Sequence, residues 1–144
     1  MSQDLEYNKP WILQRADPYV YKHTDGTYYF TASIPAYDGI VLRHSDTLAG
    51  LKDAEEVRVW QKHDKGIMSE HIWAPELHYL DGKWYIYYAG GDIDDVWAIR
   101  PYILECADQD PHDQTTANIM TGEAECSVCQ YRSKQHIPIK YKSK

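Results

Sequence analysis

Short segments rich in β-branched and aromatic residues alternate along the chain with short polar turns, a pattern typical of antiparallel strands. Asp25-Gly26 and Asp81-Gly82 mark two tight turns, because Asp-Gly favours the backbone geometry of β-hairpins. A third turn is expected over 90–95, which holds two glycines and three aspartates. The segment 46–56 is predicted to be a loop or one turn of helix. The predicted strands are 18–22, 27–34, 40–44, 57–60, 76–80, 84–89 and 96–106.

One arrangement of proline, strand, Asp-Gly turn and aromatic strand occurs twice. Pro18 precedes the first copy and Pro75 the second, 57 residues later. Strand-built repeats of roughly 40–50 residues are typical of the blades of a β-propeller. We therefore predict an all-β chain in which residues 1–111 form about two blades, the second of them beginning near Trp73.

Composition narrows the class of function. The chain has 144 residues, room for about one domain, and a net charge of −7, which argues against nucleic acid as a partner. Its aromatic residues are 13 Tyr and 5 Trp with a single Phe. Tyr and Trp combine an apolar body with a polar tip, which suits the C–H faces and hydroxyls of sugars. Aromatic residues are also ordinary strand formers, so composition leaves both sugar binding and simple packing open.

The N-terminal residues and the lengths of the apolar runs indicate where in the cell the protein is located. The segment 1–13 has no long apolar stretch, and no run approaches the roughly 18 apolar residues of a membrane span. The sequence therefore predicts a cytoplasmic protein without a membrane partner. A secreted form that has been processed at its N-terminus stays open as the alternative.

The last part of the chain differs from the rest. Residues 1–106 contain 17 of the 19 aromatic residues, and 126–144 contain basic residues but no Asp or Glu. We expect 112–144 to be an irregular, poorly ordered tail. Cys126 and Cys129, with His136, resemble half of a zinc site. One such pair is a weak signal, so zinc binding by the tail stays the minor alternative and no metal site is predicted.

Asp17 is the first candidate for chemistry. It stands between Ala16 and Pro18, where a strand begins. Proline fixes the backbone and restricts the residue before it, so the carboxylate is held in a defined direction. Inner strand ends around a propeller axis converge on one funnel, where such a carboxylate can act on a ligand. The alternative is an aspartate that caps a turn.

The segment 70–78 contains the other candidates. Trp73 stands two residues before Pro75, as Ala16 stands before Pro18, so it is expected to face the same funnel. Its indole would either stack on a sugar or pack between blades. Glu76 falls inside the predicted strand, where a buried structural carboxylate is the expected role.

Two histidines, His71 and His78, lie in the same segment beside Glu70. A zinc site needs three or four ligands that converge. A spacing of seven residues along a loop and a strand does not bring the two imidazoles together. The sequence therefore predicts no metal site here either.

In these segments the chain resembles glycoside hydrolase family 43, in particular its bacterial α-L-arabinofuranosidase-like members. The resemblance covers roughly residues 8–111, with the motifs in the same order. It rests on Arg15-Ala16-Asp17-Pro18-Tyr19-Val20, Asp25-Gly26-Thr27-Tyr28-Tyr29-Phe30-Thr31-Ala32-Ser33, His71-Ile72-Trp73-Ala74-Pro75-Glu76-Leu77-His78, Asp81-Gly82-Lys83-Trp84-Tyr85-Ile86-Tyr87 and Trp97-Ala98-Ile99-Arg100-Pro101-Tyr102.

The resemblance implies a five-bladed β-propeller that hydrolyses arabinofuranosides or xylosides with inversion. It implies three acids: an Asp base on the first blade, a second Asp that tunes pKa values, and a Glu general acid on a later blade. Asp17 matches the base. Trp73 resembles the aromatic residue that lines the pocket, and Phe30 and His71 are further candidates near the sugar. No cofactor is implied, and the sequence does not indicate whether a cation occupies the propeller centre.

The chain departs from the family pattern after Pro111. Neither the pKa-tuning Asp nor the general acid has a match in 112–144, where Glu123 and Glu125 lie outside any blade pattern. We therefore expect a truncated, weakly active or inactive glycosidase whose ligand is an arabinose- or xylose-containing oligosaccharide. Open blade edges favour self-association. The alternative is a non-catalytic carbohydrate-binding or interaction fragment.

Overall fold

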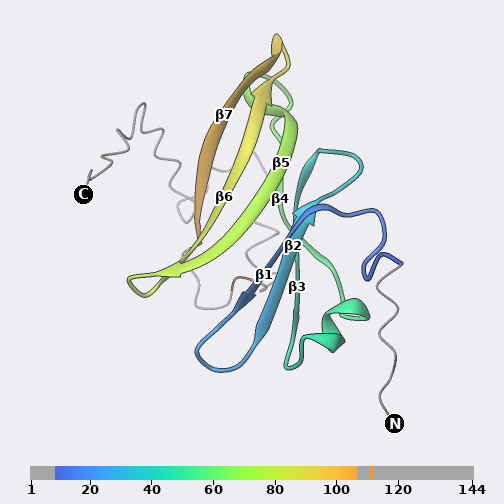
Figure 1. The fold of residues 1–144 in the computed structure, drawn as a ribbon. Coiled ribbons are helices and arrows are strands. Elements are labelled where there is room, and N and C mark those ends of the chain that lie inside the picture. The colour runs from blue at the N-terminus through green and yellow to red at the C-terminus, as the bar shows by residue number, and fades with distance from the viewer. Residues whose placement is uncertain (1–8, 107–110, 112–144) are drawn as a thin grey trace, which may run out of the picture.

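The computed structural model describes residues 9–106 and 111, which form two antiparallel sheets (Figure 1). The strand order in each sheet follows the chain order, and a short 3₁₀ helix separates the third and fourth strands. The first sheet contains β1 (Ala16–Lys22), β2 (Tyr28–Ser33), β3 (Gly39–Ser45) and β4 (Val57–Gln61), with η1 (Ala49–Lys52) between the last two. The second contains β5 (Ile67–Leu80), β6 (Lys83–Asp92) and β7 (Asp95–Cys106).

The all-β prediction is confirmed, and the predicted strands of the first sheet lie close to their observed bounds. The second sheet differs in β5, which begins at Ile67 rather than at Glu76. The extra part of the strand is irregular: its pairing with β6 shifts register three times, and Met68, His71 and Ala74 have positive φ angles. Bulges of this kind break the alternation of side chains between two faces, which is the signal that predicts a strand.

The two glycines expected in a turn lie instead near the end of β6, where both are buried. A Cβ on Gly90 would come within 3.3 Å of the Tyr102 ring, and one on Gly91 within 2.8 Å of the Val96 carbonyl oxygen. A side chain on Gly91 would therefore clash with the β7 backbone, and one on Gly90 would require the Tyr102 ring to shift. The turn itself is short, and the Asp94 amide donates a hydrogen bond to Asp92 Oδ1 at 3.0 Å.

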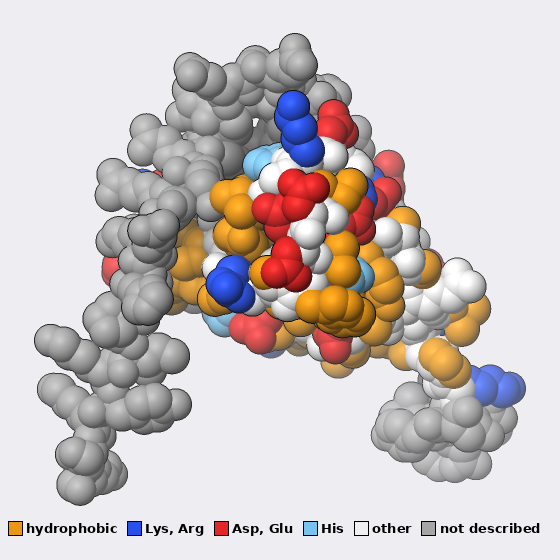
Figure 2. Space-filling view, turned by 90° about the horizontal axis from the view of Figure 1, so that it is seen from above, with side chains coloured by type: hydrophobic (Ala, Val, Ile, Leu, Met, Phe, Trp, Pro, Cys, Tyr) orange, Lys and Arg blue, Asp and Glu red, His pale blue; other side chains and the backbone are white. Residues whose placement is uncertain are grey.

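The tip of this β6–β7 hairpin lies at the upper end of Figure 1. Ile93 is half exposed, and Asp94 and Asp95 are exposed. Figure 2 looks onto the same end and shows acidic side chains lying among hydrophobic ones. The predicted acidic turn is thus solvated.

The main core lies between the two sheets, where β5 packs across β1 and β2. It contains two tryptophans, Trp60 and Trp84, of which Trp84 is the more deeply buried at 1% exposed. The Trp84 indole contacts the rings of Tyr29, at 5.0 Å between centroids, and of Tyr79, at 4.9 Å. Because each sheet buries one face against the other, the two sheets stabilise each other.

A smaller core covers the opposite face of the first sheet. Phe30, Ala32 and Leu51 are buried there, with Leu51 supplied by η1. Both faces of β2 are therefore buried. This is why aromatic and apolar residues of 28–33 lie on both faces of the strand, with Thr31 and Ser33 as its buried polar residues.

A group of ion pairs holds the chain just before β1. The Arg15 guanidinium and the Arg43 guanidinium both donate hydrogen bonds to the Glu56 carboxylate, at 3.1 Å from each Nε to Oε2. Burial alone would raise the pKa of Glu56, but these two guanidinium groups outweigh it and lower the pKa below its usual value. The network ties the start of β1 to the segment before β4 and so helps to place Asp17.

No helix in the described part of the chain is long and apolar enough to cross a membrane. The predicted tail 112–144, with Cys126, Cys129 and His136, lies outside the described residues. The division of the chain at residue 111 therefore stays a prediction.

Candidate active site

Asp17 lies at an irregular point of β1. Ala16 pairs with Ser33 and Tyr19 with Thr31, so β1 has an extra residue between these two pairs, where Asp17 stands. The φ angle of Asp17 is 49°, a left-handed conformation that costs a residue with a side chain about 1–2 kcal/mol. The following Pro18 restricts this position further. The backbone strain places an exposed carboxylate at the strand end, as the sequence predicted.

The side chain of Ser33 joins Asp17 to the second sheet. Its hydroxyl donates a hydrogen bond to Asp17 Oδ2 at 2.9 Å and accepts one from the Ala74 amide at 2.8 Å. Ser33 is 2% exposed, so the hydroxyl is shielded from water. Asp17 and the backbone directly after Trp73 are thus separated by only two hydrogen bonds.

Trp73 lies in a group of four rings at this junction. Its indole stacks on the His71 imidazole at 4.6 Å between centroids and meets the Tyr37 ring edge-on at 5.7 Å. Trp97 from β7 lies 5.1 Å from His71 and 6.4 Å from Trp73. We call His71, Trp73, Trp97 and Tyr37 the aromatic cluster. The Trp73 Nε1 atom is buried and has no hydrogen-bond partner among the described residues.

The backbone holds the aromatic cluster in place. The Ile72 amide donates a hydrogen bond to the Tyr37 carbonyl oxygen at 3.1 Å, which fixes the β2–β3 loop against β5. His71 Nδ1 lies 2.8 Å from the Val96 carbonyl oxygen. Since a carbonyl can only accept, Nδ1 carries the proton of this bond, and Nε2 of the neutral ring is left as an acceptor.

Sequence reasoning missed two members of the cluster, Tyr37 and Trp97. Trp97 is 74% exposed and Tyr37 is 40% exposed, which is unusual for such large rings. Trp97 follows a turn rich in glycine and aspartate, and Tyr37 lies inside a loop. These positions were only a weak signal of a place in the site. Only the pairing of β6 with β7 and the packing of the β2–β3 loop bring them to Trp73.

Comparisons with known proteins decide the family. The sequence profile described as "Glycosyl hydrolases family 43" matches residues 7–126. The chain belongs to this family.

Named relatives agree with the family assignment. The chain is 54% identical over 110 residues to an extracellular exo-α-(1→5)-L-arabinofuranosidase of Streptomyces avermitilis and 53% identical over 109 residues to the enzyme of that name from Streptomyces chartreusis. Each alignment covers 76% of this chain, but only 23% and 33% of the two relatives. The chain therefore spans about a quarter to a third of the length of these relatives.

A solved structure shows the same fold. The crystal structure of an α-L-arabinofuranosidase from Lactobacillus brevis is 52% identical, with a TM-score of 0.67, and the match covers 73% of this chain and 34% of that one. The two sheets of this family 43 chain are accordingly part of a β-propeller. The predicted cytoplasmic location is wrong by the same comparisons, because both Streptomyces relatives are named extracellular enzymes.

Phe30 does not join the other site candidates of this family 43 chain. It is 2% exposed and packs in the smaller core, on the face of β2 that points away from the second sheet. Ser33, three residues later, points to the opposite face and reaches Asp17. Because β2 is buried on both faces, the sequence does not reveal which of its residues face the site.

Glu76 also differs from expectation. Its side chain is 54% exposed, and its carboxylate lies 3.2 Å from His78 Nε2, so the predicted burial is wrong. Glu76 pairs with Tyr87 across the sheet. Tyr87 alternates along β6 with the core residues Ile86 and Tyr88, so its side chain points away from the first sheet, where the next blade of a propeller would pack.

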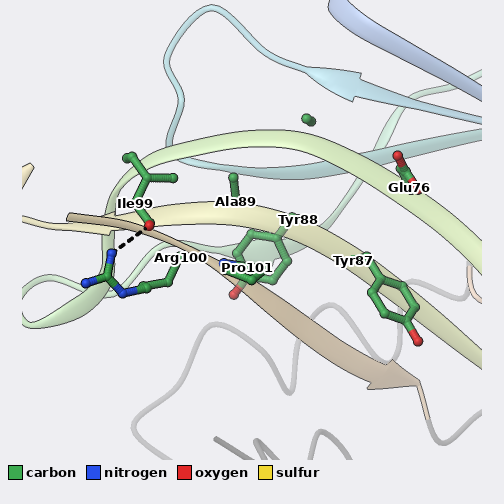
Figure 3. Close-up of a pocket in the computed structure, with 8 residues that line it drawn as sticks. Glu76, Tyr87, Tyr88, Ala89, Ile99, Arg100 and Pro101 are labelled. Atoms are coloured by element: carbon green, nitrogen blue, oxygen red, sulfur yellow. Dashed lines mark hydrogen bonds between the residues drawn. The ribbon is translucent and has the colours of Figure 1, made fainter. Parts of the chain in front are cut away.

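An open groove lies on this outer face of the second sheet (Figure 3). It is largely apolar, apart from Glu76 and Arg100. Asp17 and Trp73 do not line it, so the groove is separate from the aromatic cluster. Self-association through open blade edges stays a prediction. The lining residues are Ala74, Glu76, Tyr87, Tyr88, Ala89, Ile99, Arg100 and Pro101.

The histidines and acids of 70–78 do not converge. Glu70 pairs with Lys62 at 2.6 Å, His78 lies beside Glu76, and His71 bonds to β7. Among residues 9–106 and 111, no group of three or more His, Cys, Asp or Glu side chains is placed to hold a metal ion.

Proposed function

We propose that this chain supplies the base side of the active site of an inverting glycosidase that acts on arabinofuranosides, with xylosides as the second choice. The observation that carries the proposal is the hydrogen-bonded link between Asp17 and the backbone beside Trp73. A carboxylate two hydrogen bonds away from the backbone that carries these aromatic rings supports the proposal, because such rings suit a sugar. The names of the relatives favour α-1,5-linked arabinose oligosaccharides as the ligand.

In this proposal Asp17 acts as the general base. Ser33 occupies its Oδ2 atom, and Oδ1 has no partner among the described residues, so Oδ1 can accept the proton of a water molecule. Inversion requires that this water attack the anomeric carbon from the side opposite the leaving group, with the general acid about 6.5–9.5 Å from the base. We assign the general acid to no residue of this chain.

Trp73 and His71 bind the sugar in this proposal. The half-buried Trp73 indole offers an apolar surface for the C–H face of a furanose ring. The free Nε2 atom of His71 can accept a hydrogen bond from a sugar hydroxyl. Trp97 and Tyr37 extend the same surface outward.

Calorimetric titration of the purified chain with α-1,5-arabinotriose tests the proposal. We expect binding that Trp73→Ala weakens about tenfold or more, since a central aromatic residue often dominates a small interface. Tyr87→Ala is the matched control, because Tyr87 is an exposed ring on the outer face of the second sheet. Equal affinity of wild type and Trp73→Ala would contradict the proposed sugar site.

A non-catalytic carbohydrate-binding role is the second candidate, and the four rings of the aromatic cluster favour it. Hydrolysis of an aryl arabinofuranoside separates the two roles. Each member of an acid–base pair typically contributes about 10²–10⁴-fold to the rate, so this chain is expected to show little or no turnover. Measurable turnover that disappears in Asp17→Asn would support catalysis by the chain itself and would show that it contains an acid partner.

A further inference from the structure

The buried Ser33 hydroxyl occupies the junction between the two sheets and touches both parts of the proposed site. We propose that Ser33 is a positioning residue that couples the charge on Asp17 to the backbone of the sugar-binding segment 71–74. The inference rests on the proposed roles of Asp17 and Trp73 and deepens them. In this inference one hydroxyl fixes the position of the base relative to the aromatic surface.

The direction of the two hydrogen bonds supports this role. A serine hydroxyl has one proton, and Ser33 donates it to Asp17 Oδ2 while its oxygen accepts the Ala74 amide proton. Both bonds point the same way, from the amide through the hydroxyl to the carboxylate. A negative charge on Asp17 strengthens the first bond and polarises the second, because hydrogen bonds in a chain reinforce each other.

The backbone at both ends of this chain of bonds is strained. Asp17 has a φ angle of 49° and Ala74 of 47°, and each residue precedes a proline. Neither residue is a glycine, so the surrounding structure must hold both conformations. The Ser33 hydroxyl is the group that bonds to both residues.

The second sheet has no hydroxyl at the position that matches Ser33. In the first sheet Ala16 pairs with Ser33, and at the matching place in the second sheet Trp73 pairs with Ala89. Ala89 can neither donate nor accept through its side chain. The serine is therefore specific to the sheet that carries the carboxylate.

Nuclear magnetic resonance of the full chain tests the coupling. As the pH is lowered until Asp17 is protonated, the Ala74 amide resonance and the Ser33 Cβ resonance of the wild type should move together with the Asp17 carboxyl carbon. The Ala74 movement should be lost in Asp17→Asn, which keeps an acceptor but does not titrate. It should also be lost in Ser33→Ala and kept in Ser33→Thr, which restores the hydroxyl.

Thr31→Val is the matched control. Thr31 lies on the same strand, is fully buried, and donates its hydroxyl to the Val41 carbonyl oxygen at 2.8 Å. Loss of this hydroxyl should lower stability as Ser33→Ala does but leave the Ala74 titration unchanged. An Ala74 resonance that does not follow Asp17 in the wild type, or follows it equally in Ser33→Ala, overturns the proposal. If Ser33→Ala does not fold, the wild type alone decides. A Ser33 Cβ resonance that does not move as Asp17 titrates also overturns the proposal.

Sugar affinity separates this inference from the proposed function. Ser33→Ala should weaken binding of α-1,5-arabinotriose about tenfold, the effect of one hydrogen bond to a charged group, while Ser33→Thr should recover most of it. A wild type that binds no arabinotriose contradicts the proposed sugar site. The resonance measurements then still show whether Ser33 couples Asp17 to Ala74.

Discussion

The segments 14–17 of the first sheet and 71–74 of the second share two left-handed backbone positions but carry different side chains. Asp17 and Ala74 stand 57 residues apart, both before a proline and both with φ near 50°, and Gln14 and His71 repeat this three residues earlier with φ of 52° each. The first sheet adds a carboxylate at this point, and the second adds the Trp73 indole beside it. One repeated and strained backbone thus presents a carboxylate from one blade and an aromatic ring from the next.

This comparison shows that two blades with similar backbone can carry different side chains at matching positions. The bulge shortens pairing with the neighbouring strand and turns side chains toward the junction of the sheets. Ser33 then joins the two sheets at this point through its hydrogen bonds to Asp17 and the Ala74 amide.

The largest predicted effect comes from weakening the packing between the two sheets. Trp84→Ala removes the largest fully buried side chain of their common core and should lower the free energy of unfolding by about 3–5 kcal/mol. Urea denaturation followed by circular dichroism measures the loss. Trp97→Ala serves as control, because this exposed indole should change stability by no more than about 0.5 kcal/mol. A small loss for Trp84→Ala would mean that each blade folds independently.

The second prediction concerns the ion pairs that hold the first sheet alone. Arg15 and Arg43 lower the pKa of Glu56 in the folded chain, so the ionised carboxylate stabilises the fold above the pKa of the unfolded chain. This contribution should disappear as the pH falls through the lowered pKa of the folded state. Glu56→Gln should cost about 1–2 kcal/mol at neutral pH through its charged hydrogen bonds.

Unfolding free energies measured between neutral pH and acid check this prediction. Between the usual glutamate pKa and the lowered one, the difference between wild type and Glu56→Gln should shrink with falling pH. A difference that stays constant down to the lowest pH at which the wild type folds would show that the charge of Glu56 is not the source.

The smallest predicted effect concerns Asp17 and Ala74, the two residues with left-handed backbone before a proline. Ala74→Gly should raise stability by about 0.5–1 kcal/mol, because glycine adopts the left-handed conformation without a steric cost. Asp17→Gly should gain less or lose stability, since it also removes the hydrogen bond from Ser33, worth about 1 kcal/mol. Thermal melting of both variants measures the difference. Equal gains would show that the Asp17–Ser33 bond contributes nothing to the fold.

Several features follow from the sequence alone. The two Asp-Gly turns, the alternating or apolar segments around them and the repeated proline are local signals, so they predict the hairpins, the all-β class and the repeat. The motif around Asp17 points to its family because a few spaced residues are specific in combination. The predicted role of Asp17 as the base still awaits its test.

Other features were decided only by the tertiary structure. Bulges hide the first half of β5 from any periodic pattern, and close strand contact rather than a turn explains Gly90 and Gly91. A strand buried on both faces does not reveal that Phe30 points away from the site while Ser33 points into it. Contacts between residues 40 or more apart, such as Ser33 with Ala74, arise only when two sheets pack, because no local property of either segment specifies its partner.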